Sequence, residues 1–277
     1  MPGMFDPGTI NGMTATNRLV RSATWEGMGD DTGRFDPRLL GLYEALARGG
    51  VGLIISSYLY VRRDGRQSRT QLGAHEDAMI PGLTRLAEVV HGAGGKLIAQ
   101  IVHCGGQARR DAIDGLQPLA PSAIESPGYP EVPRALTGPE VEQLVADFAA
   151  AAGRIQEAGF DGVQLHGAHG YLLSEFLSPS RNLREDQWGG GVEERSRFCL
   201  AVYRAVRARV GPGFPVMIKL NAHDFLDGST TEVDSSYLAA ALAAEGLDAV
   251  EVSGGTPGSG SLGATRPGID GPGAEAY

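Results

Sequence analysis

Short apolar runs alternate with longer segments of helical spacing along the chain, and this alternation constrains the fold more than any other feature. The apolar runs predict buried strands at Leu19–Val20, Val51–Ser56, Lys96–Val102, Gly162–Leu165, Val216–Leu220 and Ala249–Val252. The segments between them predict helices at Arg38–Arg48, Leu83–His91, Pro139–Ala158, Glu193–Val210 and Ser235–Ala244. Since parallel strands need a crossover connection, usually a helix, the chain is predicted to form an α/β fold with a parallel sheet.

Turn and cap signals mark the same boundaries. Glycine lies between a predicted helix and the next strand at four junctions, which contain residues 49–50, 94–95, 159 and 246. Proline or a capping residue opens helices at Asp36-Pro37, Thr137–Glu140 and Thr231–Asp234. The many tight loops of such a fold explain why 41 of the 277 residues are glycine.

A parallel sheet of this kind is either doubly wound or closed into a barrel. The first strand is followed by RSATWE at residues 21–26, which lacks the glycine fingerprint of a doubly wound dinucleotide-binding sheet. A (β/α)8 barrel is therefore favoured, and six strands are counted where closure needs eight. We expect residues 1–277 to form a single incomplete barrel domain with about the first six β/α units, lacking the last two.

Composition and charge exclude several classes of protein. The formal charge of −9 argues against a nucleic-acid partner, because phosphates favour a basic surface. No apolar run is long enough for a membrane helix, and residues 1–4 open no signal sequence, so a cytoplasmic location is expected. The two cysteines, Cys104 and Cys199, are too few for a four-thiolate metal or iron-sulfur site and predict reduced thiols.

In a barrel the chemistry lies at the carboxyl ends of the strands, where HGAHGY at residues 166–171 is the most informative segment. His166 and His169, three positions apart, would face the same side of a helical turn. Two imidazoles there could stabilise negative charge on a carbonyl or phenolate oxygen, and Tyr171 could supply a proton. The alternatives are a metal-ligand pair or hydrogen-bonded structural histidines, with a tyrosine that only packs.

Other strand ends carry further candidates. Gln100 offers a donor and an acceptor to a planar heterocycle such as a flavin, or is a satisfied core amide. Lys219 could stabilise the reduced anion of such a ring, form a Schiff base, or pair with a buried barrel acid. In the long loop at residues 178–191, Arg184 and Asp186 are predicted to pin the loop rather than react.

Four segments together resemble the Old Yellow Enzyme, or NADH:flavin oxidoreductase, family along the whole chain: Asn17–Thr24, Gln100, His166–Tyr171 and Ser178–Gly191. The resemblance implies FMN at the barrel mouth, reduced by NADH or NADPH and reoxidised by an activated alkene such as an unsaturated carbonyl compound. Nicotinamide and substrate would use one site in turn.

The resemblance also implies roles for individual residues. The backbone at Ala23 and Thr24, with Gln100 and Lys219, would contact the flavin. His166 and His169 would bind the substrate oxygen. Tyr171 would protonate the α-carbon after the flavin has delivered hydride to the β-carbon.

The sequence departs from the family pattern in ways that leave alternatives open. Gly106 stands where relatives often have arginine, and Trp188 and Gly191 stand where tyrosine and serine are usual. The loops after strands seven and eight, which hold the flavin phosphate in the family, are expected to be missing, so a catalytically impaired fragment is one alternative. A homo-oligomer that covers the exposed sheet edges also stays open. A metal-dependent barrel hydrolase would use the two histidines with Glu175 or Asp186.

Overall fold

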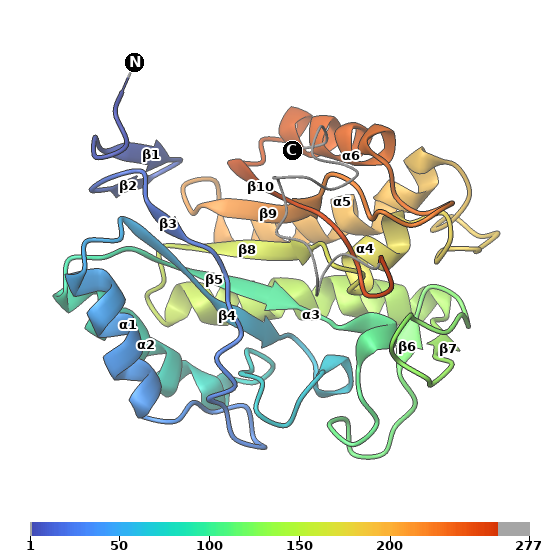
Figure 1. Cartoon of the computed structure of the whole chain (residues 1–277), viewed down its shortest axis with the longest axis horizontal. Coiled ribbons are helices and arrows are strands. Elements are labelled where there is room, and N and C mark those ends of the chain that lie inside the picture. The colour runs from blue at the N-terminus through green and yellow to red at the C-terminus, as the bar shows by residue number, and fades with distance from the viewer. Residues whose placement is uncertain (1, 260–277) are drawn as a thin grey trace.

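Six parallel strands form the central sheet of the computed structural model, which describes residues 2–259 (Figure 1). Their order in the sheet is their order in the chain: β3 (Val20–Arg21), β4 (Leu53–Tyr60), β5 (Leu97–Val102), β8 (Gly162–Gly167), β9 (Val216–Asn221) and β10 (Ala249–Ser253). In a doubly wound sheet the strand order reverses at a switch point, and the strand order of this sheet does not reverse. The winding is that of an incomplete (β/α) barrel, which confirms the predicted fold class.

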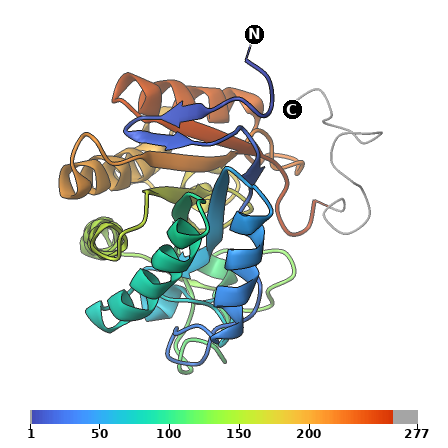
Figure 2. The ribbon, with the colours of Figure 1, turned by 90° about the vertical axis from the view of Figure 1, so that its left-hand side faces the viewer.

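Long helices connect the strands and lie outside the curved sheet (Figure 2). They are α1 (Arg38–Arg48), α2 (Ile80–Gly92), α3 (Gly138–Glu157), α5 (Val192–Val210) and α6 (Glu232–Ala244), and the short α4 (Leu172–Leu177) follows β8. Capping boxes at Thr137 with Glu140 and at Thr231 with Asp234 confirm two of the predicted helix starts. Within residues 2–259, no helix is both long enough and apolar enough to cross a membrane.

Several short elements were not predicted from the sequence. An antiparallel hairpin of β1 (Gly8–Ile10) and β2 (Met13–Ala15) precedes the sheet. A two-stranded sheet of β6 (Leu119–Ala120) and β7 (Arg134–Ala135) and three single 3-10 turns lie in the loops. The turns are η1 (Arg63–Gly65), η2 (Asp77–Met79) and η3 (Gly105–Gln107).

The inner face of the sheet is apolar at the amino ends of the strands. Met13 of the hairpin packs there in one cluster with four strand residues: Leu53, Ile55, Ile98 and Met217. Polar residues follow two positions later on several of the same strands, because alternate residues of a strand point to the same face. The hairpin therefore covers the apolar end of the inner face, and the polar residues lie toward the carboxyl ends of the strands.

A register shift in β4 turns a tyrosine into the barrel. The pairing of β4 with β5 is irregular between Ile55 and Tyr58, and both residues contact inner-face clusters although they are an odd number of positions apart. One extra residue in a strand reverses the faces of the residues that follow. Tyr58, which lies beyond the predicted end of this strand, thereby reaches the carboxyl end of the inner face.

Candidate active site

Polar side chains from five strands or strand ends meet inside the sheet. The strand register sets Gln100 opposite Gln164, and it aligns His166 with Lys219 and Lys219 with Glu251. Parallel strands end at one edge of a sheet, so these side chains share one end of the barrel. Of this group, the sequence had identified Gln100, His166 and Lys219.

A continuous hydrogen-bonded chain joins four of these side chains to Ser22, which follows β3. Gln100 Nε2 donates to Gln164 Oε1 (2.7 Å), and Gln164 Nε2 donates to Glu251 Oε2 (2.8 Å). Lys219 Nζ lies 3.0 Å from Glu251 Oε1 and donates to Ser22 Oγ (2.8 Å). Burial alone would raise the pKa of Glu251, but the Ser22 hydrogen bond and the Lys219 charge outweigh it and lower that pKa. The structure thus contains the Lys219 ion pair that was one of the three sequence alternatives.

His166 and His169 lie close together, but they do not share a helical turn as predicted. His166 lies in β8, and His169 follows the strand in a loop, so the expected helical turn is wrong. Their ring centroids are 5.1 Å apart at an interplanar angle of 78°. His169 has a left-handed backbone (φ 61°), which is rare for a residue with a side chain. Asn221 Oδ1 accepts from its N–H, and Gln107 Nε2 donates to its carbonyl, so both peptide groups are held.

Both imidazoles are neutral at neutral pH. Burial, His169 and Lys219 together lower the pKa of His166 well below its usual value. Burial, followed by the Lys219 charge, lowers the pKa of His169 to about 4. His166 Nδ1 accepts from the Ala168 N–H (3.4 Å), which assigns the ring proton to Nε2, and no hydrogen bond joins this Nε2 to another of the described residues. His166 therefore presents a free N–H donor, while His169 Nε2 lies 2.7 Å from Ser253 Oγ.

The rings of Tyr171 and His166 are nearly perpendicular, with a centroid distance of 4.7 Å and an interplanar angle of 88°. Its other neighbour is Tyr58, on which it stacks at 5.8 Å and 26°. Burial, together with the nearby Cys104 and tyrosine hydroxyls, raises the pKa of Tyr171 well above 10, so the phenol stays protonated. A partly buried, protonated phenol can serve as a general acid, and an N–H donor beside it can bind a carbonyl oxygen.

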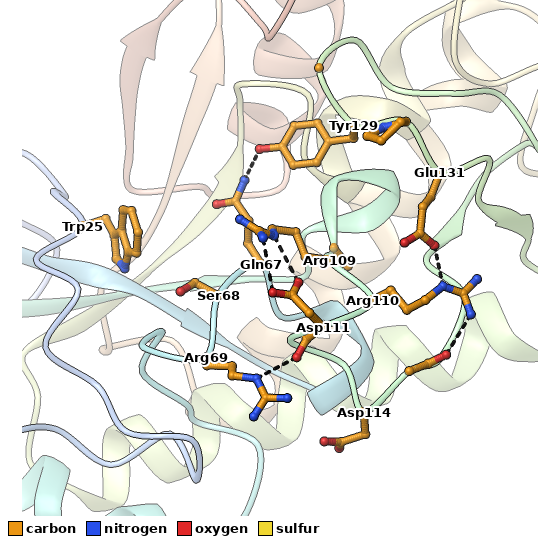
Figure 3. Close-up of a pocket in the computed structure, with 14 residues that line it drawn as sticks. Trp25, Gln67, Ser68, Arg69, Arg109, Arg110, Asp111, Asp114, Tyr129 and Glu131 are labelled. Carbon is orange, nitrogen blue, oxygen red and sulfur yellow. Dashed lines mark hydrogen bonds and ion pairs between the residues drawn. The ribbon is translucent and has the colours of Figure 1, made fainter.

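A cavity of about 870 Å³ adjoins this cluster (Figure 3). Its wall includes Trp25 from the segment after β3 and Tyr129 from the loop before β7, and Figure 3 shows the Gln67 amide bonded to the Tyr129 hydroxyl. Guanidinium groups on the wall are matched by carboxylates, Arg109 with Asp111 and Arg110 with Glu131. Neither imidazole lines the cavity, and Gln67 is the residue that connects it to Tyr171.

The remaining candidates from the sequence are Ala23 and Thr24, after β3, and Arg184 and Asp186, in the long loop. The peptide N–H groups of Ala23 and Thr24 make no hydrogen bond to residues 2–259. Arg184 pairs with Asp186 and also donates to the Pro121 and Leu136 carbonyl oxygens, so both residues pin the long loop as predicted.

Other polar residues of the site were missed. Gln164 and Glu251 could have been found from period-two alternation, because Gln164 lies two positions before the candidate His166 and Glu251 lies within the predicted strand Ala249–Val252. Gln67 had no such signal, since two of its side-chain partners, Tyr171 and Tyr129, lie 104 and 62 positions away.

Glu175, proposed above as a metal ligand, is instead a buried acid bound by the backbone. Its two carboxyl oxygens each lie 3.1 Å from the Gly106 N–H, and Ser126 Oγ lies 3.2 Å from one of them. A Cβ at Gly106 would lie 2.8 Å from Glu175 Oε1, so Glu175 fills the space beside the residue that replaces the family arginine. No group of three metal-binding side chains occurs among the described residues, which leaves the hydrolase alternative without support.

The contribution of Glu175 to the free energy of unfolding is expected to fall with rising pH. Burial raises its pKa to about 8, from 4.5, so the folded chain binds the proton more tightly than the unfolded chain. The stabilisation is complete below pH 4.5 and is lost as the pH rises to about 8. Between pH 6 and 7 the loss is about 1 kcal/mol. The lowered pKa values of His75, His166 and His169 give a contribution of opposite sign, because the unfolded chain protonates these imidazoles more readily. Chemical denaturation at the two pH values should therefore show the Glu175 contribution as the difference in slope between the parent chain and Glu175→Gln.

Glu157→Gln at the exposed end of α3 is the matched control and should keep the dependence of the parent chain. An unchanged slope in Glu175→Gln would contradict this origin of the pH dependence.

Comparison with known proteins shows one consistent likeness. The model of the NADH:flavin oxidoreductase / NADH oxidase family matches residues 3–255. A curated NADH oxidase from Thermoanaerobacter brockii is 37% identical over 255 residues, which are 92% of this chain and 39% of that protein. A solved complex of 2-naphthoyl-CoA reductase with 2-naphthoyl-CoA has a TM-score of 0.91 at 28% identity, over 96% of this chain and 43% of that one.

A second solved structure, of an old yellow enzyme homologue from Zymomonas mobilis, has a TM-score of 0.84 at 30% identity. The match covers 91% of this chain and 74% of that one. The chain thus spans less than half of the NADH oxidase and of the naphthoyl-CoA reductase, but about three quarters of this smaller homologue.

Proposed function

The chain belongs to the NADH:flavin oxidoreductase / NADH oxidase family, and from that premise we propose that it binds FMN and reduces alkenes conjugated to a carbonyl group, with NADH or NADPH as the reductant. The observation that carries the proposal is the meeting of His166, His169 and Tyr171 beside the chain of polar side chains that ends at Lys219. A neutral donor pair and a protonated phenol suit the polarisation and protonation of such a substrate.

The residues of the barrel mouth fit a flavin. The peptide groups of Ala23 and Thr24 are free to bond, Gln100 carries an amide, and Lys219 carries a positive charge. A planar heterocycle with several carbonyl and N–H groups needs this mixture of donors, acceptors and one cation. When bound, FMN supplies hydride-transfer chemistry between a nicotinamide and an alkene.

We propose that the two histidines bind the carbonyl oxygen of the substrate. The Nε2–H of His166 makes no hydrogen bond within residues 2–259, so it can donate to that oxygen without breaking a bond. Since both imidazoles are neutral, they stabilise charge that develops on the oxygen by hydrogen bonding, and the nearby Lys219 adds a positive field. The held backbone of His169 fixes where its ring lies.

Tyr171 is proposed as the proton donor. Its O–H bond breaks as a C–H bond forms at the α-carbon of the substrate, and the electron pair stays on the phenolate oxygen. The high pKa of Tyr171 keeps the proton available at neutral pH. The adjoining 870 Å³ cavity, with Trp25 and Tyr129 on its wall, is large enough for the part of a substrate that lies beyond the reacting bond.

We expect the purified chain to retain FMN through gel filtration and to show a flavin absorption spectrum. Anaerobic NADH or NADPH should bleach this spectrum, and an enone such as 2-cyclohexenone should restore it. A chain that takes up no FMN would contradict the whole proposal. Bleaching without restoration by any conjugated alkene would contradict the alkene substrate and favour the catalytically impaired alternative. Homo-oligomer formation and a cytoplasmic location stay predictions.

A further inference from the structure

Gln67 occupies the centre of a hydroxyl network that the sequence did not reveal. Its side-chain Oε1 accepts from Tyr58 Oη (2.8 Å) and from Tyr171 Oη (3.0 Å). Its Nε2 donates to Tyr129 Oη, on the wall of the cavity in Figure 3. The amide therefore uses both of its ends, with its acceptor facing Tyr58 and Tyr171 and its donor facing the cavity.

The position of Gln67 is itself fixed. Its backbone N–H donates to Gln71 Oε1 (2.8 Å), and Gln71 Nε2 donates in turn to the Tyr58 carbonyl (3.3 Å). Gln71 is fully buried, so this second amide holds the first one to β4. A side chain held in this way can determine the direction of the hydroxyl bonds that it accepts.

Tyr171 needs such support because its surroundings oppose the loss of its proton. Burial and neighbouring hydroxyls stabilise the neutral phenol, which keeps it protonated but makes it a weak acid. A proton donor becomes effective when nearby hydrogen-bond donors stabilise the charge it acquires. The Tyr58 hydroxyl, bonded to the same Gln67 oxygen and stacked on the Tyr171 ring, is the donor within reach.

We propose that Gln67 is a positioning residue that holds the Tyr171 and Tyr58 hydroxyls at one oxygen, so that Tyr58 can donate to the Tyr171 phenolate when Tyr171 gives up its proton. In the resting site both O–H groups point to Gln67 Oε1. When Tyr171 Oη–H transfers its proton to the α-carbon, the Tyr58 O–H turns from Gln67 to the new phenolate oxygen. Proton and charge balance, since one C–H bond replaces one O–H bond. This inference rests on the proposed role of Tyr171.

Gln67→Met, of similar length and without polar atoms, tests the proposal in the FMN-loaded chain. We expect reoxidation by an enone to slow roughly tenfold, the effect of losing a well-placed hydrogen bond, while reduction by the nicotinamide stays within twofold of the parent rate. Tyr58→Phe should give the same split, because it keeps the ring stack and removes the hydroxyl. Gln143→Met, the same change on the exposed face of α3, is the matched control.

The double variants decide between positioning and a general effect on the fold. In a Tyr171→Phe background, Gln67→Met should have no further effect on reoxidation, because it acts through the hydroxyl that is gone. An equal slowing in both backgrounds would overturn the proposal, as would a Gln67→Met chain with unchanged reoxidation. If Tyr171→Phe itself changes nothing, the proposed function fails instead, so the two failures are distinguishable.

A second measurement requires no bound flavin. In a chain labelled with 13Cζ-tyrosine, the Tyr171 and Tyr58 signals are assigned by their loss in the two phenylalanine variants. Gln67→Met should shift both of these signals, and Gln143→Met should shift neither. Unshifted Tyr171 and Tyr58 signals in folded Gln67→Met would overturn the hydrogen bonding on which the inference depends.

Discussion

Tyr171→Phe is expected to slow the reduction of a conjugated alkene by roughly 10²- to 10⁴-fold, the contribution of a well-placed general acid. The substitution keeps the ring against His166 and Tyr58 and removes only the hydroxyl. No other group can take over at once, because the Tyr58 hydroxyl is directed to Gln67 and both imidazoles are neutral with low pKa values. Stopped-flow absorbance of the bound flavin, recorded separately for its reduction and its reoxidation, measures the effect.

The two half-reactions are expected to respond differently in this variant. Reduction by NADH or NADPH needs no proton from Tyr171 and should stay within a few-fold of the parent rate. Tyr203→Phe is the matched control, since it removes another tyrosine hydroxyl, bonded to the Glu245 carbonyl on the outer side of the barrel, and should leave both rates unchanged. Equal slowing of both half-reactions in Tyr171→Phe would argue against a proton-donor role.

Lys219→Met should destabilise the folded chain by about 3 kcal/mol and abolish retention of FMN. Lys219 is the only cation within 4 Å of Glu251 among the described residues, and both side chains are largely buried. Removing one partner of a buried pair leaves a carboxylate without compensation, which is the costly case. The loss of the positive charge also removes the group proposed to face the flavin. Urea unfolding and FMN retention through gel filtration measure the two effects.

Two comparisons separate the charge from the packing. Lys96→Met breaks a more exposed pair with Asp161, which keeps its contact with His91, and should cost under about 1 kcal/mol. Adding Glu251→Gln to Lys219→Met removes the unpaired charge and should restore most of the stability but not the FMN. A double variant as unstable as Lys219→Met alone would show that the ion pair is not the cause.

The buried cation and the neutral histidines together define the electrostatics of the site. Lys219 lowers the pKa of both imidazoles, and Glu251 is kept ionised by Ser22 and Lys219. The charge needed at the substrate oxygen is therefore supplied by a fixed cation and by N–H donors, and not by protonated histidine. Both imidazoles keep the same protonation state from about pH 5 upwards, so the histidines themselves should add no pH dependence to the rate of substrate reduction in the neutral range.

The sequence by itself determined the order and type of the main elements, because those depend on local patterns. Apolar runs, helical spacing, the Thr137 and Thr231 capping boxes and the glycine junctions are all read within a few residues, and each main helix and strand was found. The HGAHGY segment marked His166, His169 and Tyr171 for the same reason. The single-direction winding followed from the alternation and from the missing dinucleotide fingerprint.

Only the tertiary structure decided how the site works. The polar chain from Gln100 to Lys219 depends on strand register, and register is set by packing across the sheet rather than by neighbours in sequence. The irregular pairing in β4 that turns Tyr58 inward, and the bonds that Gln67 makes over 62 and 104 positions, have no local signal. The pKa values of the histidines and of Tyr171 arise mainly from burial, which exists only once the chain has folded.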